Sequence, residues 1–107
     1  MPEAPRILAF AGSLRSGSLN KKFVRVAAGV AERAGAEVKV IDLADYRMPL
    51  YDGDGETADG MPESAVRLRR LLEEYPGFLI SCPEYNSSIP GVLKNAIDWV
   101  SRPLPGE

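Results

Sequence analysis

Two polar stretches carry residue types and spacings suited to binding an anionic ligand. The first, GSLRSGSLN at residues 12–20, follows an apolar run and leads into an amphipathic pattern. Backbone N–H groups at a helix start are unpaired and lie at the positive end of the helix dipole, which favours a phosphate. The side chains that could complete such a cradle are Ser13, Arg15, Ser18 and Asn20. The alternative is that Ser18 only caps the helix and Arg15 is a solvated loop charge.

The second stretch, PEYNSS at residues 83–88, follows another short apolar run. Backbone N–H and C=O groups of such a loop can bind the edge of a flat heteroaromatic ring, and Tyr85 could line the face of that ring. Each residue also has a structural interpretation. Tyr85 could pack at an interface, Glu84 could be a solvated or intersubunit carboxylate rather than a general base, and Asn86 could support a turn.

Other residues with reactive or aromatic side chains have structural interpretations. Cys82 is predicted to be a small buried strand residue rather than a nucleophile. Trp99 lies at helical spacing from Ala96, which favours a core or subunit contact over a ligand contact. Lys94 and Asp98 are one turn apart and predict an exposed ion pair.

Composition removes several classes of function. The 107 residues make at most one domain, and their net charge of -2 gives no electrostatic reason to expect nucleic acid or a membrane surface. With no histidine and one cysteine, hydrolytic triads and zinc sites are disfavoured. Gly12 and Gly17 have the spacing of a phosphate-binding Walker loop, but the Lys-Ser/Thr pair is missing, and there is no GxGxxG. Residues 1–5 are too short and polar for a signal peptide, which predicts a cytoplasmic setting.

The elements that must position these loops alternate between strands and helices, which predicts an α/β fold with parallel strands and right-handed crossovers. Ligands of such sheets bind at the carboxyl ends of the strands. The expected elements are a buried strand at 6–12, a helix at 19–34, a strand at 37–43, an irregular connection at 44–61, a helix at 62–75, a strand at 78–82 and a helix at 90–100.

Details of these elements can also be predicted. Ser18 is the expected cap of the helix at 19–34, and Pro90 is the expected first residue of the last helix. Apolar residues spaced i, i+4, i+7 and i+11 predict the apolar face of the helix at 19–34. These residues are Phe23, Ala27, Val30 and Ala34.

Together the two polar stretches resemble the NADPH-dependent FMN reductase family, whose members include quinone, azo-dye and chromate reductases. The family pattern G-S-L-R-x-x-S-x-N is matched at residues 12–20, and P-E-Y-N-x-S-x-P-G-x-L-K-N-A-I-D-W is matched at residues 83–99. The resemblance implies a flavodoxin-like, doubly wound parallel sheet. Residues 1–107 would form a single partial domain with the first three βα units, strand order 2-1-3, and an unpaired apolar edge at the third strand.

By the same resemblance, Ser13, Arg15, Ser18 and Asn20 would hold the phosphate of FMN. The isoalloxazine ring would be surrounded by Pro83, Glu84, Tyr85, Asn86 and Ser87. NADPH or NADH would reduce the flavin, which would pass electrons to a quinone, azo dye or similar small acceptor, with no catalytic side chain and no metal. Relatives are dimers or tetramers, which implies a homo-oligomer. The alternatives are a non-enzymatic FMN-binding electron carrier, or an inactive fragment stable only as an oligomer.

Overall fold

A computed structural model describes residues 4–107 and contains a three-stranded parallel sheet in the order β2-β1-β3. The strands are β1 (Arg6–Ala11), β2 (Glu37–Val40) and β3 (Gly77–Ser81). The continuous apolar sequence of β1 places it in the centre, where both faces of the sheet are covered. The predicted α/β architecture and the strand order 2-1-3 are confirmed, although all three strands end before their predicted last residue.

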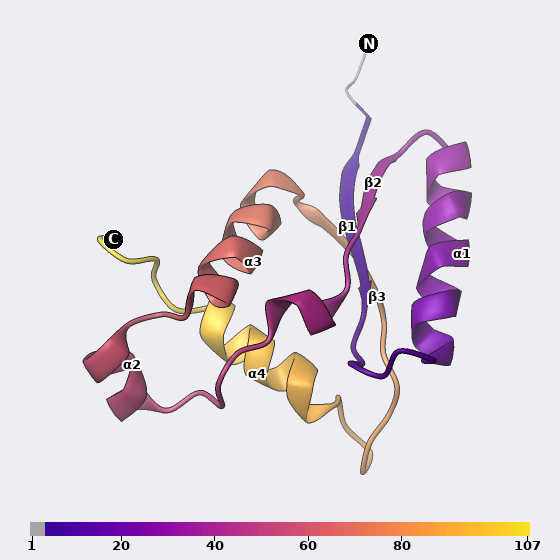
Figure 1. Ribbon diagram of the computed structural model, residues 1–107. Coiled ribbons are helices and arrows are strands. Elements are labelled where there is room, and N and C mark those ends of the chain that lie inside the picture. The colour runs from indigo at the N-terminus through magenta and orange to yellow at the C-terminus, as the bar shows by residue number, and fades with distance from the viewer. Residues whose placement is uncertain (1–3) are drawn as a thin grey trace.

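Helices cover both faces of the sheet (Figure 1). On one face lies α1 (Leu19–Arg33), and on the other lie α3 (Glu63–Glu74) and α4 (Gly91–Val100). Pro90 is the N-cap of α4 rather than its first helical residue. Across residues 4–107, no helix is both long and apolar enough to cross a membrane.

The central strand divides the core into two clusters. Leu8 and Phe10 point toward the α3 and α4 side and belong to the larger cluster. Ala9 and Ala11 point the other way and pack with Ala28 and its neighbours on α1. The small alanines let α1 approach the sheet closely, whereas the larger side chains fill the space beneath two helices.

The buried face of α1 differs from the prediction. Phe23 is 64% exposed and Val30 is 55% exposed, although both were expected in the core. The face that meets the sheet instead carries Lys21, Val24 and Ala28. Both sets of residues have helical periodicity, but it is Val24 and Ala28 of the second set that pack on the alanines of β1. Contacts with the sheet therefore decide which face is buried, and a stripe of large apolar residues is left outside.

The connection at 44–61 is more ordered than predicted. It contains a 3₁₀ turn, η1 (Leu43–Tyr46), and a short helix, α2 (Gly53–Asp59). The carboxylate of Asp42 accepts a hydrogen bond from the backbone N–H of Ala44 at 2.9 Å. Asp52 caps α2 in the same way, at 3.1 Å from the N–H of Asp54. Asp42, which was predicted to be a strand residue, and Asp52, in the connection itself, are thus helix caps.

A polar and aromatic network fastens this connection to α4. The indole Nε1 of Trp99 donates to the carbonyl oxygen of Pro49 at 2.8 Å, and the amide of Asn95 donates to the same oxygen at 3.0 Å. Asn95 also accepts from the backbone N–H of Tyr51 at 2.7 Å. The rings of Tyr51 and Trp99 meet edge to face with centroids 4.9 Å apart. Trp99 is 2% exposed, which confirms the prediction of a core residue.

Candidate functional site

The loops after β1 and β3 leave the sheet side by side, because these strands are neighbours. The backbone N–H of Gly12 donates to the carbonyl oxygen of Ser81 at 2.9 Å. The hydroxyl of Ser81 donates to Oδ1 of Asn20 at 2.7 Å, which ties the end of β3 to the start of α1. A Cβ on Gly12 would lie 3.2 Å from Cδ2 of Leu93, so a side chain at position 12 would crowd the start of α4. The structure therefore brings the two predicted loops to one edge.

The first loop combines a helix cap with unused hydrogen-bond donors. The hydroxyl oxygen of Ser18 accepts from the N–H groups of Asn20 and Lys21 at 3.1 and 3.3 Å, which confirms the predicted cap. The hydroxyl oxygen of Ser13 accepts from the N–H of Arg15 at 3.3 Å. Because a hydroxyl can accept and donate at once, both serines keep a proton for a ligand. Capping and anion binding by Ser18 are thus compatible.

The second loop contains a tight turn in an uncommon backbone conformation. Tyr85 and Ser88 exchange two backbone hydrogen bonds, at 3.0 and 3.1 Å. Between them, Asn86 and Ser87 have φ angles of 52° and 64°. Positive φ at both central residues is the pattern of a type I′ turn, which asparagine tolerates better than serine does. The turn therefore stores strain at the place where a ligand is expected.

Most side chains of the second loop are exposed to solvent. Glu84, Tyr85, Asn86 and Ser87 are exposed, and Pro83 is half-buried. Cys82 is also exposed, which contradicts the prediction of a buried strand residue. The reason is that β3 ends at Ser81, so Cys82 already belongs to the loop.

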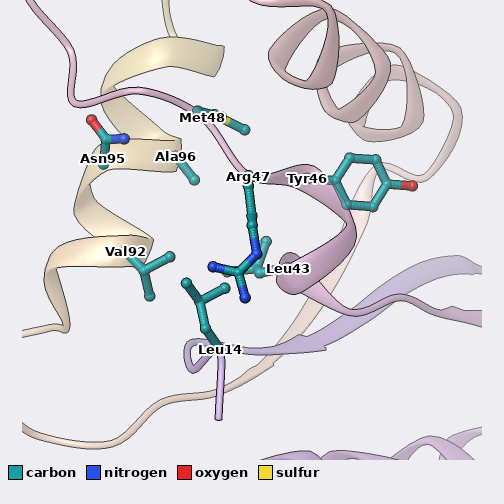
Figure 2. Close-up of a pocket in the computed structure, with 8 residues that line it drawn as sticks. All are labelled: Leu14, Leu43, Tyr46, Arg47, Met48, Val92, Asn95 and Ala96. Atoms are coloured by element: carbon teal, nitrogen blue, oxygen red, sulfur yellow. The ribbon is translucent and has the colours of Figure 1, made fainter. Parts of the chain in front are cut away.

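A cavity of about 100 Å³ lies beside the first loop (Figure 2). In Figure 2 the side chain of Arg47 reaches toward Leu14, with Val92 on one side and Leu43 on the other, while the ring of Tyr46 turns away. Small-molecule sites measure roughly 300–1,000 Å³, so this space is too small for a flavin ring. The open edge between the two loops remains the candidate site. The cavity is lined by Leu14, Leu43, Tyr46, Arg47, Met48, Val92, Asn95 and Ala96.

Comparison with known proteins decides the family. The model of the NADPH-dependent FMN reductase family matches residues 5–107. The chain belongs to the NADPH-dependent FMN reductase family. This membership confirms the resemblance seen in the two polar stretches and agrees with a flavodoxin-like fold.

Relatives in this reductase family are about twice as long. The chain is 40% identical to quinone reductase of Escherichia coli K12, over all of this chain and 58% of that protein. It is 41% identical to probable NADPH:quinone oxidoreductase 2 of Oryza sativa subsp. japonica, over 95% of this chain and 50% of that protein. Among solved structures it resembles the flavoenzyme FerB of Paracoccus denitrificans, with a TM-score of 0.73 and 40% identity over 91% of this chain and 50% of that one. The chain thus spans about half the length of these reductases.

One residue that supports the candidate site was not predicted from the sequence. Lys21 is 8% exposed, and its Nζ lies 3.0 Å from a carboxylate oxygen of Asp42. The same Nζ donates to the carbonyl oxygen of Leu14 at 3.2 Å, which holds the first loop in place. Lysine is rarely buried, so the residue type at position 21 indicated a surface position. The available signal was its spacing from Val24 and Ala28, which lie three and seven residues further along the buried face.

Two carboxyl groups have lowered pKa values, that of Asp42 beside Lys21 and that of Glu56 on α2. Burial raises the pKa of Asp42, but its hydrogen bond from a backbone N–H and its contact with Lys21 outweigh that effect and lower it from 3.8. Hydrogen bonds, above all that from Arg102, lower the pKa of Glu56 from 4.5. Both carboxyl groups thus stay ionised to a lower pH in the folded chain than in the unfolded chain.

These shifts predict a loss of stability in acid. A lowered pKa stabilises the fold above the ordinary values of 3.8 and 4.5, and this contribution is lost as the pH falls through the lowered values. We expect the free energy of unfolding, measured in urea, to fall below about pH 4.5. The double variant Asp42→Asn, Glu56→Gln should flatten this dependence, whereas Asp59→Asn at the end of α2 should retain it. An unchanged acid dependence in the double variant would contradict the assignment.

A second prediction concerns the strained turn of the second loop. Replacing Ser87 by glycine should raise the free energy of unfolding by about 1 kcal/mol, because glycine adopts positive φ without steric cost. Urea unfolding measures this change. Ser88→Gly is the matched control, since Ser88 lacks positive φ and glycine should destabilise the chain there. Equal destabilisation in both variants would show that position 87 carries no strain.

Proposed function

We propose that this chain binds FMN across the loops after β1 and β3 and is the flavin-binding part of an NAD(P)H-dependent quinone reductase. The observation that carries the proposal is the juxtaposition of a helix-start anion cradle and an exposed, strained turn. The hydrogen bond from Gly12 to Ser81 joins these two loops. A ligand with a phosphate at one end and a flat ring at the other matches this arrangement.

The first loop fits a phosphate in charge as well as in geometry. The first turn of α1 carries no acidic residue, so no negative charge there repels a phosphate that the helix dipole attracts. The hydroxyl protons of Ser13 and Ser18, the amide of Asn20 and the guanidinium of Arg15 are the proposed donors. Lys21 is paired with Asp42, so its ammonium group holds the first loop in place and is not a proposed contact of the phosphate.

The second loop is the proposed site of the isoalloxazine ring, with contacts from Pro83, Glu84, Tyr85, Asn86 and Ser87. Tyr85 is 54% exposed, so its ring is available to cover a flat ligand. Bound FMN would supply the transfer of hydride and electrons, while these residues bind and orient the ring. No acid or base from the chain is needed, in keeping with a sequence without histidine.

The proposed donor is NADPH or NADH and the proposed acceptor is a quinone, because relatives carry the names NADPH:quinone oxidoreductase and quinone reductase. The test adds FMN, NADPH or NADH, and a benzoquinone to the purified chain and follows absorbance of the nicotinamide. Steady consumption supports a reductase. FMN uptake without consumption supports an electron carrier instead, and no FMN uptake overturns both. Assembly into a homodimer or homotetramer stays a prediction, which sedimentation of the loaded chain tests.

A further inference from the structure

Lys21 is a charged residue whose side chain is buried at the start of α1. That side chain is 10% exposed. The helix dipole opposes a cation near the amino end of a helix, and removing a charge from water costs free energy. Pairing with Asp42 offsets this cost, but a buried ion pair is often no more stabilising than apolar side chains in the same place. Stability alone therefore gives little reason for a lysine at this position.

The ammonium group of Lys21 joins two segments besides its own helix. Its Nζ donates to Oδ2 of Asp42, just after the end of β2, at 3.0 Å, and to the carbonyl oxygen of Leu14 at 3.2 Å. The other carboxylate oxygen of Asp42 accepts from the backbone N–H of Ala44 at 2.9 Å, which fixes the carboxylate. Asp42 thus anchors the ammonium group, and the ammonium group holds one peptide of the first loop.

The peptide that Lys21 holds is the one between Leu14 and Arg15. In a planar trans peptide the C=O and the N–H point in opposite directions, so a fixed carbonyl oxygen also fixes the direction of the N–H. That N–H belongs to Arg15 and donates to the hydroxyl oxygen of Ser13 at 3.3 Å. A cation on the carbonyl oxygen polarises the peptide and strengthens the hydrogen bond at its other end. The contacts therefore form one chain from Asp42 to Ser13.

We propose that Lys21 is a positioning residue for the phosphate of FMN and acts through this peptide. The role rests on the proposed FMN site, and the two donors that Lys21 places are the Ser13 hydroxyl and the Arg15 guanidinium. Ser13 is 6% exposed and accepts from the N–H of Arg15, so its hydroxyl proton is directed to another partner. Donors that are in place before the ligand arrives lose less entropy on binding.

Direct contact with the phosphate is the alternative role for the Lys21 charge. Two of the three ammonium protons are already donated, to Asp42 and to Leu14. The carboxylate of Asp42 also neutralises the charge that would attract a phosphate. The geometry therefore favours placement of the loop over contact with the ligand.

The first test measures backbone motion in the chain without flavin, by NMR relaxation of its amides. The Arg15 amide should be rigid, with an order parameter of about 0.85, and Lys21→Met should lower this value below about 0.6. Lys22→Met is the matched control, because it removes the same charge from the exposed neighbouring residue and should leave the Arg15 amide rigid. A mobile Arg15 amide in the parent chain would overturn the proposal even if Lys21→Met fails to fold, and so would an unchanged order parameter in Lys21→Met.

The second test compares affinities for FMN and riboflavin by flavin fluorescence. Lys21→Met should weaken FMN binding by roughly 5–30-fold, because the ligand must then order the backbone of the loop, and it should leave riboflavin binding unchanged. Lys21→Arg keeps the charge and the donors and should restore most of the preference for FMN, whereas Lys22→Met should not alter that preference. Equal weakening of both flavins by Lys21→Met would mean that Lys21 only stabilises the fold, which overturns the proposal.

Double-mutant cycles with Ser13→Ala and with Arg15→Ala separate positioning from direct contact. If Lys21 acts through these residues, Lys21→Met should weaken FMN binding less in either variant than in the parent chain. Full additivity in both cycles would mean that Lys21 contacts the phosphate itself, against the proposal. Absence of FMN binding by the parent chain is a different failure. It would overturn the proposed FMN site, and the role of Lys21 toward the phosphate with it, whatever the order parameters show.

Discussion

Replacing Trp99 by alanine is expected to lower the free energy of unfolding by about 3–5 kcal/mol. Trp99 is 2% exposed, so truncation leaves a cavity between α4 and the connection after η1. It also removes the hydrogen bond from Nε1 to Pro49 and the edge contact with the ring of Tyr51. Because domains are stable by only about 5–15 kcal/mol, this loss is a large fraction of the total free energy of unfolding. Urea unfolding followed by circular dichroism measures the effect.

Two further variants separate packing from hydrogen bonding. Trp99→Phe keeps a ring but removes the donor, and it should cost less than the alanine variant. Asn95→Ala removes the amide that donates to Pro49 and accepts from Tyr51, so about 1–3 kcal/mol is expected. Ile97→Ala is the control on the same helix, since Ile97 is 44% exposed. A cost for Trp99→Ala no larger than that for Ile97→Ala would contradict a central role in the core.

The order of elements could be predicted because each element has a local signal. The apolar run of β1 has the length of a buried strand, and Ser18 caps α1 by accepting hydrogen bonds from the N–H groups of Asn20 and Lys21. The edge position of β3 followed from counting strands. Local signals thus determine which elements exist and in which order they follow.

Three of the differences have another cause, which is contact between segments distant in the sequence. Phe23 was placed in the core by periodicity, but the alanines of β1 select the opposite face of α1. Lys21 is buried because its Nζ donates hydrogen bonds to the carboxylate of Asp42 and to the carbonyl oxygen of Leu14. Asp42 lies far along the chain, and Leu14 belongs to the loop before α1. The connection at 44–61 is ordered by Asn95 and its neighbours on α4. A single sequence contains these residues but not their proximity.

The candidate site also combines features with a local signal and features that depend on the folded chain. The two loops and their residue types could be read directly, and parallel strand order was enough to predict that the loops are neighbours. The positive φ angles of Asn86 and Ser87 could not be read, since no glycine marks the turn. The hydrogen bond from Ser81 to Asn20 could not be predicted either, because these residues are far apart in the sequence.

Replacing Arg15 by alanine is expected to weaken FMN binding by roughly 10–100-fold, the usual loss for a charged hydrogen bond. The backbone of Arg15 is held at both ends, by the hydroxyl of Ser13 and by the N–H of Ser18. A guanidinium on a fixed backbone loses less entropy when it binds a phosphate, whereas its exposed position makes a large change in stability unexpected. Titration followed by flavin fluorescence measures the affinity.

Riboflavin, which lacks the phosphate, gives the decisive comparison. Arg15→Ala should leave riboflavin affinity unchanged, so the preference for FMN over riboflavin should fall by the same roughly 10–100-fold. Arg15→Lys should recover part of that preference, because the charge is kept but the planar fork is lost. Arg33→Ala, at the far end of α1, should change neither affinity. If FMN affinity is unchanged, or if both affinities fall together, Arg15 does not contact the phosphate and the first loop has been assigned to the wrong part of the ligand.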